Sequence, residues 1–383
     1  MKIAFLIRKL DRGGAETQLM YLAKGLIDSG HNVQIFVFYG GGSLEGKYTE
    51  LGIPLNSLNK SGRWDLLFFA TRWLIAVAKF RPCIVYSFLT EANLVALLVK
   101  FVRPSTDIIW GIRAASDDSS LRPHDVFVWL GFNIARMLSK VPTYIVTNSY
   151  AGAETIAKKR FSRKGLVTIV NGVDMDEFII SQSSRDWLCA EQNVLKSRPL
   201  IGIVARLDPI KNHQLFLLAA KTYLDNYDCA TFVLVGDGNR SYKSLLEKMI
   251  TKLDIEENVI WLGERSDMCQ IYSALDVTTL CSNSEATPNV ILESMACGTP
   301  CVATRVGDVA RLLDGSGITI ETNDHNSLAA AWAKSLERSA VTGREELAQQ
   351  LRTFVNKSYS LEKMVDNTLV LIEQSAVNNS GCI

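Results

Sequence analysis

Short apolar runs alternate with amphipathic stretches along the whole chain. Residues 2–7 form an apolar run that ends in a Gly-rich loop, and in residues 16–28 the apolar positions recur with the period of a helix. Further apolar runs follow at 33–38, 83–87, 107–112, 144–147 and 167–170. Continuous apolar strands that alternate with helices predict a parallel sheet covered by helices on both faces.

A second series of the same kind begins after a polar stretch, and its apolar runs lie at 200–205, 230–236, 259–263, 277–282, 299–304 and 317–320. We therefore expect an α/β protein of two doubly wound Rossmann-like domains facing each other across a cleft, with ligands at the carboxyl ends of the strands. The expected boundaries are 1–180 for the N-terminal domain, 181–198 for a linker, 199–355 for the C-terminal domain, and 356–383 for a C-terminal helix able to cross back to the N-terminal domain.

Composition places the chain among compact soluble proteins. Of its 383 residues 48% are hydrophobic and 21% are charged, and no uncharged apolar run reaches the ~18–20 residues that a spanning helix needs. The first apolar run is followed at once by Arg8 and Lys9, so no secretory signal is expected. Eight scattered cysteines without a C-x-x-C pair indicate reduced thiols. We expect a cytoplasmic protein.

Charge is distributed unevenly between the two halves. Residues 1–180 hold 22 Lys and Arg against 15 Asp and Glu, which gives +7, and the remainder holds 19 against 25, which gives −6. The net charge of +1 argues against a nucleic-acid partner. The basic half fits either peripheral contact with an anionic membrane, at the inner face of the cell membrane, or ordinary surface variation. The aromatic, basic segments 63–81 and 126–140 likewise fit either a membrane-binding helix or a core helix.

Two cations stand at the end of the first strand of the second series. Arg206 and Lys211 lie in the loop before a helix that opens near Asn212. Fixed cations beside a helix N-terminus make a diphosphate site, although Arg and Lys in loops are more often solvated surface charges.

Two carboxylates follow a later strand. Glu285 lies in the loop after residues 277–282, and Glu293 lies one turn into the next helix. Carboxylates so placed can accept hydrogen bonds from two different sets of hydroxyl groups on one ligand, whereas a Glu near a helix N-terminus is also explained by the helix dipole.

These motifs together resemble a known family. The spacing R-x4-K at Arg206 and Lys211 is followed by E-x7-E at Glu285 and Glu293. The runs G-G-A-E at 13–16, N-G-V-D at 171–174, V-G-D-G at 235–238 and W-L-G at 261–263 stand in the same order along the chain. The pattern is similar to glycosyltransferase family four, the retaining GT-B enzymes called glycosyl transferases group one, and it covers nearly the whole chain.

The resemblance implies a role for each matching position. Arg206 and Lys211 would bind the donor's diphosphate and stabilise the leaving group, Glu285 would contact the sugar ring, and these three would be the catalytic residues. Glu293 would hold the ribose hydroxyls. The other implied donor-binding residues are Gly13, Gly14, Gly263, Arg265, Thr287, Asn289 and Val290.

Three positions are expected on the acceptor side, namely Glu16, Arg113 and His124. Many family members have a His near the position of Arg113, and a lone His such as His124 is more often a packed or surface residue than a catalytic one. The chain also has Ala286 where the family usually has Gly, so the loop around the donor sugar is expected to differ.

The resemblance implies a retaining, metal-independent hexosyltransferase. Its donor would be a UDP- or GDP-sugar, no cofactor would be needed, and its acceptor would be a glycan or polyprenyl-linked glycan of bacterial surface polysaccharide synthesis, such as lipopolysaccharide, capsule or exopolysaccharide. A nucleotide-sugar epimerase of the same fold and a non-catalytic sugar-nucleotide-binding module stay open as alternatives. A dehydrogenase is excluded because Ser241 replaces the third Gly after Gly236 and Gly238. The Asp174-x-Asp176 pair has no second carboxylate cluster, so no metal site is expected.

Overall fold

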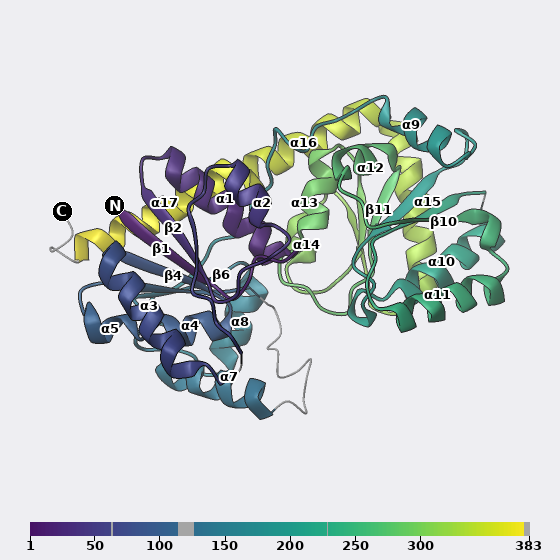
Figure 1. Ribbon diagram of the computed structural model, residues 1–383. Coiled ribbons are helices and arrows are strands. Elements are labelled where there is room, and N and C mark those ends of the chain that lie inside the picture. Colours follow the sequence, from purple (N-terminus) through teal and green to yellow (C-terminus); the bar gives the residue numbers. More distant parts are fainter. Residues whose placement is uncertain (63, 114–125, 228, 379–383) are drawn as a thin grey trace. The chain divides into compact units, whose positions relative to one another are not determined.

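The computed structural model describes residues 1–62, 64–113, 126–227 and 229–378. It consists of two compact units: Met1–Gly172 with the segment from Leu361 onward, and Val173–Ser360. Each unit is built on one parallel sheet with helices on its faces, so the predicted α/β class with two doubly wound domains is confirmed (Figure 1).

The first unit contains a seven-stranded sheet in the order β3-β2-β1-β4-β5-β6-β7. Its strands are β1 Lys2–Ile7, β2 Asn32–Val37, β3 Leu55–Ser57, β4 Ile84–Phe88, β5 Asp107–Ile112, β6 Tyr144–Thr147 and β7 Leu166–Thr168. The helices are α1 Gly14–Asp28, α2 Glu45–Glu50, α3 Leu66–Phe80, α4 Thr90–Ala96, α5 Val99–Val102, α7 Val126–Leu138, α8 Tyr150–Lys158 and α17 Leu361–Asn378.

Both faces of this sheet are buried, as the continuous apolar strands predict. Alternate side chains of β1 enter two different core clusters: Ile3, Phe5 and Ile7 pack with α1 and α17, and Ala4 and Leu6 pack with α3. This alternation follows from the two-residue period of a strand, so an apolar side chain is needed at every position.

Helix α3 shows which residues of segment 63–81 belong to the core, where the sequence left a core helix and a membrane-binding helix as alternatives. Phe69 and Trp73 are fully buried against Phe36 and Phe38 of the second strand's end, so they belong to the core. Phe68 lies on the other side of the helix and is exposed. The segment is therefore a core helix with one apolar face left open to solvent.

The second unit contains a six-stranded sheet in the order β10-β9-β8-β11-β12-β13. Its strands are β8 Leu200–Val204, β9 Thr231–Val235, β10 Val259–Gly263, β11 Val277–Leu280, β12 Cys301–Thr304 and β13 Ile318–Ile320. The helices are α9 Ser184–Glu191, η1 Pro209–Lys211, α10 His213–Asn226, α11 Arg240–Leu253, η2 Glu256–Asn258, α12 Met268–Ala274, α13 Asn289–Ala296, α14 Val309–Leu313, α15 His325–Thr342 and α16 Arg344–Tyr359.

Residues 181–198, expected as a linker, lie within this second unit. They contain helix α9, whose Leu188 and Cys189 are buried together with Ile271 and Ala274 of α12. The sequence does not reveal this packing, because only one side of the short helix α9 is buried and the rest of the segment is polar.

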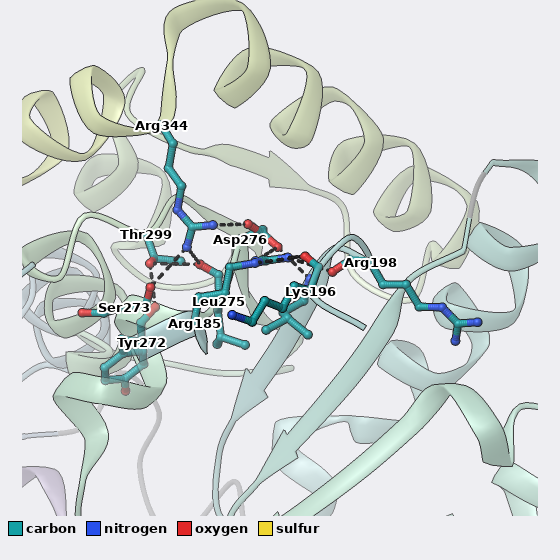
Figure 2. Close-up of polar contacts among 10 residues, drawn as sticks. Arg185, Lys196, Arg198, Tyr272, Ser273, Leu275, Asp276, Thr299 and Arg344 are labelled. Carbon is teal, nitrogen blue, oxygen red and sulfur yellow. Dashed lines mark hydrogen bonds and ion pairs between the residues drawn. The ribbon is translucent and has the colours of Figure 1, made fainter. Parts of the chain in front are cut away.

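A network around Asp276 holds the helices to the amino end of the second sheet. Arg185 of α9 and Arg344 of α16 reach Asp276 from two sides, at 2.6 and 2.5 Å, and the backbone N–H of Leu200 donates to the same carboxylate at 2.7 Å (Figure 2). Leu200 begins β8 and Asp276 directly precedes β11, so the network lies at the end of the sheet opposite to the carboxyl ends of these strands. The network therefore ties α9 and α16 to the sheet at the end away from the carboxyl ends of the strands.

Candidate active site

The candidate site forms where the order of the second sheet reverses. Strands β8 and β11 are neighbours, but β9 follows β8 in the chain and lies on its other side. The connections after β8 and β11 therefore leave in opposite directions, and in open parallel sheets ligands bind at the carboxyl ends of the strands at such a point. Lys211 follows β8 and Glu285 follows β11, so the switch point brings them together.

Lys211 and Glu285 form a direct ion pair. The Lys211 Nζ lies 2.6 Å from the Glu285 Oε1, and the two side chains are 26% and 12% exposed. The hydroxyl of Ser282 donates to the same Oε1 at 2.6 Å. Lys211 and Ser282 thus both use one oxygen of the carboxylate, and in the described part of the chain the Oε2 remains open to a ligand's hydroxyl group.

The loop that carries Lys211 is held by its own hydrogen bonds. Asp208 caps the short helix η1 by accepting from the Ile210 N–H at 3.0 Å. Asn212 adopts a left-handed conformation with φ of 52°, which Asn tolerates better than most residues. Its amide donates to the side chains of Asn283 and Asn323 at 3.3 and 3.0 Å. This amide cluster ties the loop after β8 to the loop after β11.

Arg206 is placed differently from Lys211. Its guanidinium donates to Asp208 at 3.1 Å, and the side chain is 68% exposed. An exposed ion pair of this kind contributes ~0–1 kcal/mol, so it can rearrange at little cost to meet an anion. The structure thus brings Lys211 and Glu285 together. Arg206 follows the same strand as Lys211 but pairs with Asp208 instead.

Glu293 lies on α13 and faces Tyr272 of α12. The Tyr272 hydroxyl donates to the Glu293 Oε2 at 2.8 Å. Burial raises the pKa of Glu293 to about 7, the hydrogen bond from Tyr272 opposes this shift, and the nearby charge of Glu177 adds to it. The carboxyl group is therefore only partly ionised at neutral pH, and a ligand hydroxyl that donates to it would favour the ionised form.

The backbone around α13 supports both carboxylates. Thr287 is buried, and Asn289 and Val290 open the helix after Pro288, which stands at the N-cap and makes no side-chain capping bond. The first N–H groups of a helix are a ready-made site for an anionic or hydroxyl-bearing ligand. Gly307 packs on the neighbouring loop, and the Asp308 N–H donates to the Ala286 carbonyl at 3.2 Å.

Gly263 and Arg265 follow β10. Gly263 has a φ of 68° and accepts a backbone hydrogen bond from Gly236 at 2.7 Å. The Arg265 guanidinium donates to Asp267 at 2.6 and 2.9 Å and to Glu191 at 3.3 Å, and it lies over the Trp187 ring. Both carboxylates raise the pKa of Arg265. The Arg265 side chain therefore contacts residues of the second unit, to which it belongs itself.

The first unit holds Gly13, Gly14 and Glu16. Gly13 precedes α1, and Gly14 is the first residue of that helix. A Cβ on Gly13 would lie 2.4 Å from the Glu16 carboxylate, so a side chain here would require that carboxylate to move. Burial raises the pKa of Glu16, while its own backbone N–H lowers it and Asp11 raises it further.

Arg113 stands at the carboxyl end of β5. Its guanidinium lies 4.4 Å from the Phe88 ring centre and donates to Asn171 at 3.3 Å and to the Tyr86 hydroxyl at 3.4 Å. Its Nε is buried and has no partner in the described structure. A cation held only by neutral groups suits an anionic ligand. His124 lies outside the described residues.

Several residues of the site escape sequence reasoning. Ser282 and Tyr272 orient the two carboxylates, and Asn283, Asn323 and Gly307 fix the loops. Their types are common in loops and helices, and no spacing sets them apart. Only Ser282, at the end of a buried strand and three residues before Glu285, carries a local signal.

The Asp174-x-Asp176 pair has a structural explanation in its own turn. Asp174 accepts from the backbone N–H groups of Asp176 and Glu177 at 2.9 and 3.1 Å, so it closes a turn. Across the described ranges, no three His, Cys, Asp or Glu side chains gather as ligands for a metal ion. Nor does any described helix combine the length and hydrophobicity needed to cross a bilayer.

Comparison with known proteins identifies the family and the fold of this chain. Residues 12–177 match the family described as Glycosyltransferase Family 4, and residues 198–338 match Glycosyl transferases group 1. The structure superposes on Anabaena HepE in complex with UDP with a TM-score of 0.85 and 20% identity, covering 98% of this chain and 100% of that one. The fold is therefore GT-B.

Two curated relatives show what similar chains do. A UDP-Gal:α-D-GlcNAc-diphosphoundecaprenol α-1,3-galactosyltransferase of Escherichia coli is 28% identical over 55% of this chain and 54% of its own length. An α-1,4-N-acetyl-D-galactosaminyltransferase of Campylobacter jejuni that acts on an undecaprenol-linked glycan is 28% identical over 77% of each chain. With most of these curated relatives, the match spans about half of their length.

Proposed function

Because the chain belongs to the group 1 glycosyl transferases of family 4, we propose that it is a retaining hexosyltransferase. It moves a sugar from a UDP- or GDP-sugar to a hydroxyl group of a polyprenyl-linked glycan in bacterial surface polysaccharide synthesis. The Lys211–Glu285 pair at the switch point of the second sheet is the observation that carries this proposal.

The pair suits the transfer step by its chemistry. Lys211 and Arg206 provide positive charge for the diphosphate that leaves the sugar, and preorganised charge of this kind is the largest single contribution to many enzymatic rates. Glu285 keeps one oxygen open for a hydroxyl of the sugar, and the Tyr272–Glu293 pair offers a carboxylate for the ribose hydroxyls. A phosphate oxygen of the leaving group can accept the proton of the acceptor's hydroxyl group. The acceptor then attacks from the face that the leaving group departs from, and the configuration is retained.

Loss of Lys211 provides the direct test. We expect Lys211→Ala to lower kcat about 10²–10³-fold, because it removes one charge from the leaving-group site. Lys221→Ala is the matched control: Lys221 is a partly exposed residue of α10 that pairs with Asp225. Turnover is measured with a panel of UDP- and GDP-sugars, and the products are identified by mass and by anomeric NMR.

The products also test the reaction class. An isomerised nucleotide sugar would show an epimerase, binding without turnover would show a non-catalytic module, and an inverted linkage would contradict retention. Near-normal turnover by a folded Lys211→Ala variant would contradict the proposed active site.

We further propose that the reaction needs no metal ion, because in the proposed site Arg206 and Lys211 would supply the positive charge that stabilises the diphosphate. Turnover should persist in excess EDTA. Full loss that Mn²⁺ or Mg²⁺ restores would contradict the proposal.

The first unit offers a surface for peripheral contact with the inner face of the cell membrane. Ile75 of α3 and Phe101 of α5 are exposed, the two helices lie side by side, and Lys79 and Lys100 accompany them (Figure 1). Each Lys near an anionic surface contributes ~1 kcal/mol, and buried aromatic groups add to this.

Sedimentation with phosphatidylglycerol vesicles tests this surface. We expect Ile75→Asp and Phe101→Asp each to reduce the bound fraction severalfold, whereas Val341→Asp, at an equally exposed apolar position of α15 in the other unit, should leave it unchanged. Equal binding by all variants would contradict the membrane proposal.

A further inference from the structure

An aromatic ring flanked by two cations stands on the carboxyl edge of the first sheet. Arg8 follows β1, Tyr39 follows β2 and Lys60 follows β3. The Arg8 guanidinium lies 5.9 Å from the Tyr39 ring centre, and the Lys60 Nζ lies 5.6 Å from it. Three neighbouring strands thus deliver two positive charges to one ring.

The backbone fixes this arrangement. The Tyr39 N–H donates to the Arg8 carbonyl at 3.1 Å, and the Lys60 N–H donates to the Phe38 carbonyl at 2.8 Å. These bonds continue the ladder of the sheet beyond the strands, so the three residues are held near one another before any ligand arrives.

The two charges are poorly neutralised. Arg8 has Glu91 at 3.4 Å, but both side chains are more than half exposed, and such a pair is weak. Lys60 donates to the Gly62 carbonyl, and no carboxylate in the described ranges pairs with it. Two cations that share one ring repel each other, so an anion that spans both would relieve the repulsion.

Exposed apolar side chains lie close to Lys60 along the chain. Trp64 is 83% exposed and Leu67 is 82% exposed, and Leu66 and Phe68 are exposed beside them at the start of α3. Asp65 accepts a hydrogen bond from the Ser61 N–H at 3.0 Å and pairs with Arg72. The Lys60 ammonium also lies 5.8 Å from the Phe69 ring, so the cationic and apolar parts adjoin.

We propose that Arg8, Tyr39 and Lys60 bind the diphosphate of a polyprenyl-diphosphate-linked acceptor, and that Trp64, Leu66, Leu67 and Phe68 contact the first isoprene units. This subsite rests on the proposed function, since it concerns the lipid-linked acceptor. A bulk membrane surface needs only scattered lysines, whereas paired cations around one ring at the carboxyl edge of a parallel sheet form a ligand site.

Direct binding tests the subsite without relying on turnover. The probes are farnesyl diphosphate, inorganic diphosphate and farnesol, titrated calorimetrically against the full chain. We expect farnesyl diphosphate to bind at least tenfold more tightly than either fragment. Arg8→Ala and Lys60→Ala should each weaken it at least tenfold, and Trp64→Ala should weaken it severalfold while leaving inorganic diphosphate unaffected.

A control variant locates the binding. Lys47→Ala removes an exposed charge from α2 of the same unit and should not change the affinity for farnesyl diphosphate. Thermal melting of every variant separates loss of the subsite from loss of the fold.

Two results would overturn the subsite. One is equal affinity of wild type and Lys60→Ala for farnesyl diphosphate. The other is binding to phosphatidylglycerol vesicles that falls in step with farnesyl diphosphate binding. Failure of the proposed function is distinguishable, because a chain that transfers no sugar but binds farnesyl diphosphate through Lys60 keeps the subsite and loses the reaction.

Discussion

At the scale of single residues, the environment of Glu293 makes folding depend on pH. Burial raises its pKa to about 7 in the folded chain, against an ordinary value of 4.5. The folded state therefore binds the proton more tightly than the unfolded state, and stability falls as pH rises from about 4.5 to 7.

We expect Glu293→Gln to abolish this contribution. Relative to the variant, the wild type should lose up to about 3 kcal/mol of unfolding free energy between pH 4.5 and pH 8, from roughly 1.4 kcal/mol for each unit of pKa. Urea unfolding at pH 5 and pH 8 measures the difference. Parallel curves for the two proteins would show that the carboxyl group is ionised throughout.

Cys269 is the second residue with an unusual titration. The side chain of Cys297 hydrogen-bonds to its sulfur and the Ile179 N–H lies 3.4 Å away, and these contacts lower the pKa of the Cys269 thiol to about 6. The thiolate should therefore dominate at neutral pH.

Alkylation rates report this state. We expect one cysteine to react with iodoacetamide at a rate that is half-maximal near pH 6, and Cys269→Ala to remove that phase. Cys281 and Cys301 are buried, and their raised pKa values predict slow reaction. A rate for Cys269 that rises only above pH 8 would contradict the assignment.

At the scale of elements, the loop that holds Glu285 depends on a glycine in a different loop. Gly307 has a φ of 51°, and a Cβ there would lie 2.0 Å from the Glu285 carbonyl oxygen. Any side chain at this position must displace the backbone that carries Glu285.

Gly307→Ala should therefore reduce turnover at least tenfold as well as stability. Gly315→Ala is the matched control, because Gly315 also has a positive φ, of 78°, but nothing lies within 4 Å of its Cβ position. The control should cost about 1–2 kcal/mol from backbone strain alone and keep its turnover. Equal turnover in the two variants would show that the loop adjusts freely.

At the scale of the whole molecule, the first unit is assembled from both ends of the chain. Helix α17 lies beside α1, and its Val365 approaches Gly25 so closely that a Cβ there would be 2.4 Å away (Figure 1). Leu371 and Ile372 enter the same core cluster as the first strand. The segment after Ser360 thus completes the core of a unit that begins at Met1.

Two apolar positions of α17 test this role. Ile372→Ala should cost about 2–5 kcal/mol, because Ile372 is fully buried. Val370 is 53% exposed, so Val370→Ala should stay within about 0.5 kcal/mol of wild type. Urea unfolding compares them, and similar losses would show that α17 contributes no specific packing.

Local sequence patterns were enough to predict the fold class and the family. Apolar strands that alternate with helices require sheets buried on both faces, and both sheets have strands in the expected stretches. The first sheet adds the short edge strand β3, Leu55–Ser57, which the apolar pattern did not predict. The motif spacing placed Lys211 and Glu285 after strands of one domain, and the family and the fold that it indicated are confirmed. These features depend on local pattern and on residue type, which a sequence displays directly.

Only the tertiary structure decided which groups meet. Lys211 and Glu285 are 74 positions apart and become partners because β8 and β11 are neighbours in the sheet. Arg265 turns to Glu191 of α9, and Phe69 lies in the core while Phe68 does not. Strand order, helix rotation and long-range pairing arise from the packing of the whole unit, because side chains far apart in sequence compete for the same buried space, and no local pattern records which of them prevails.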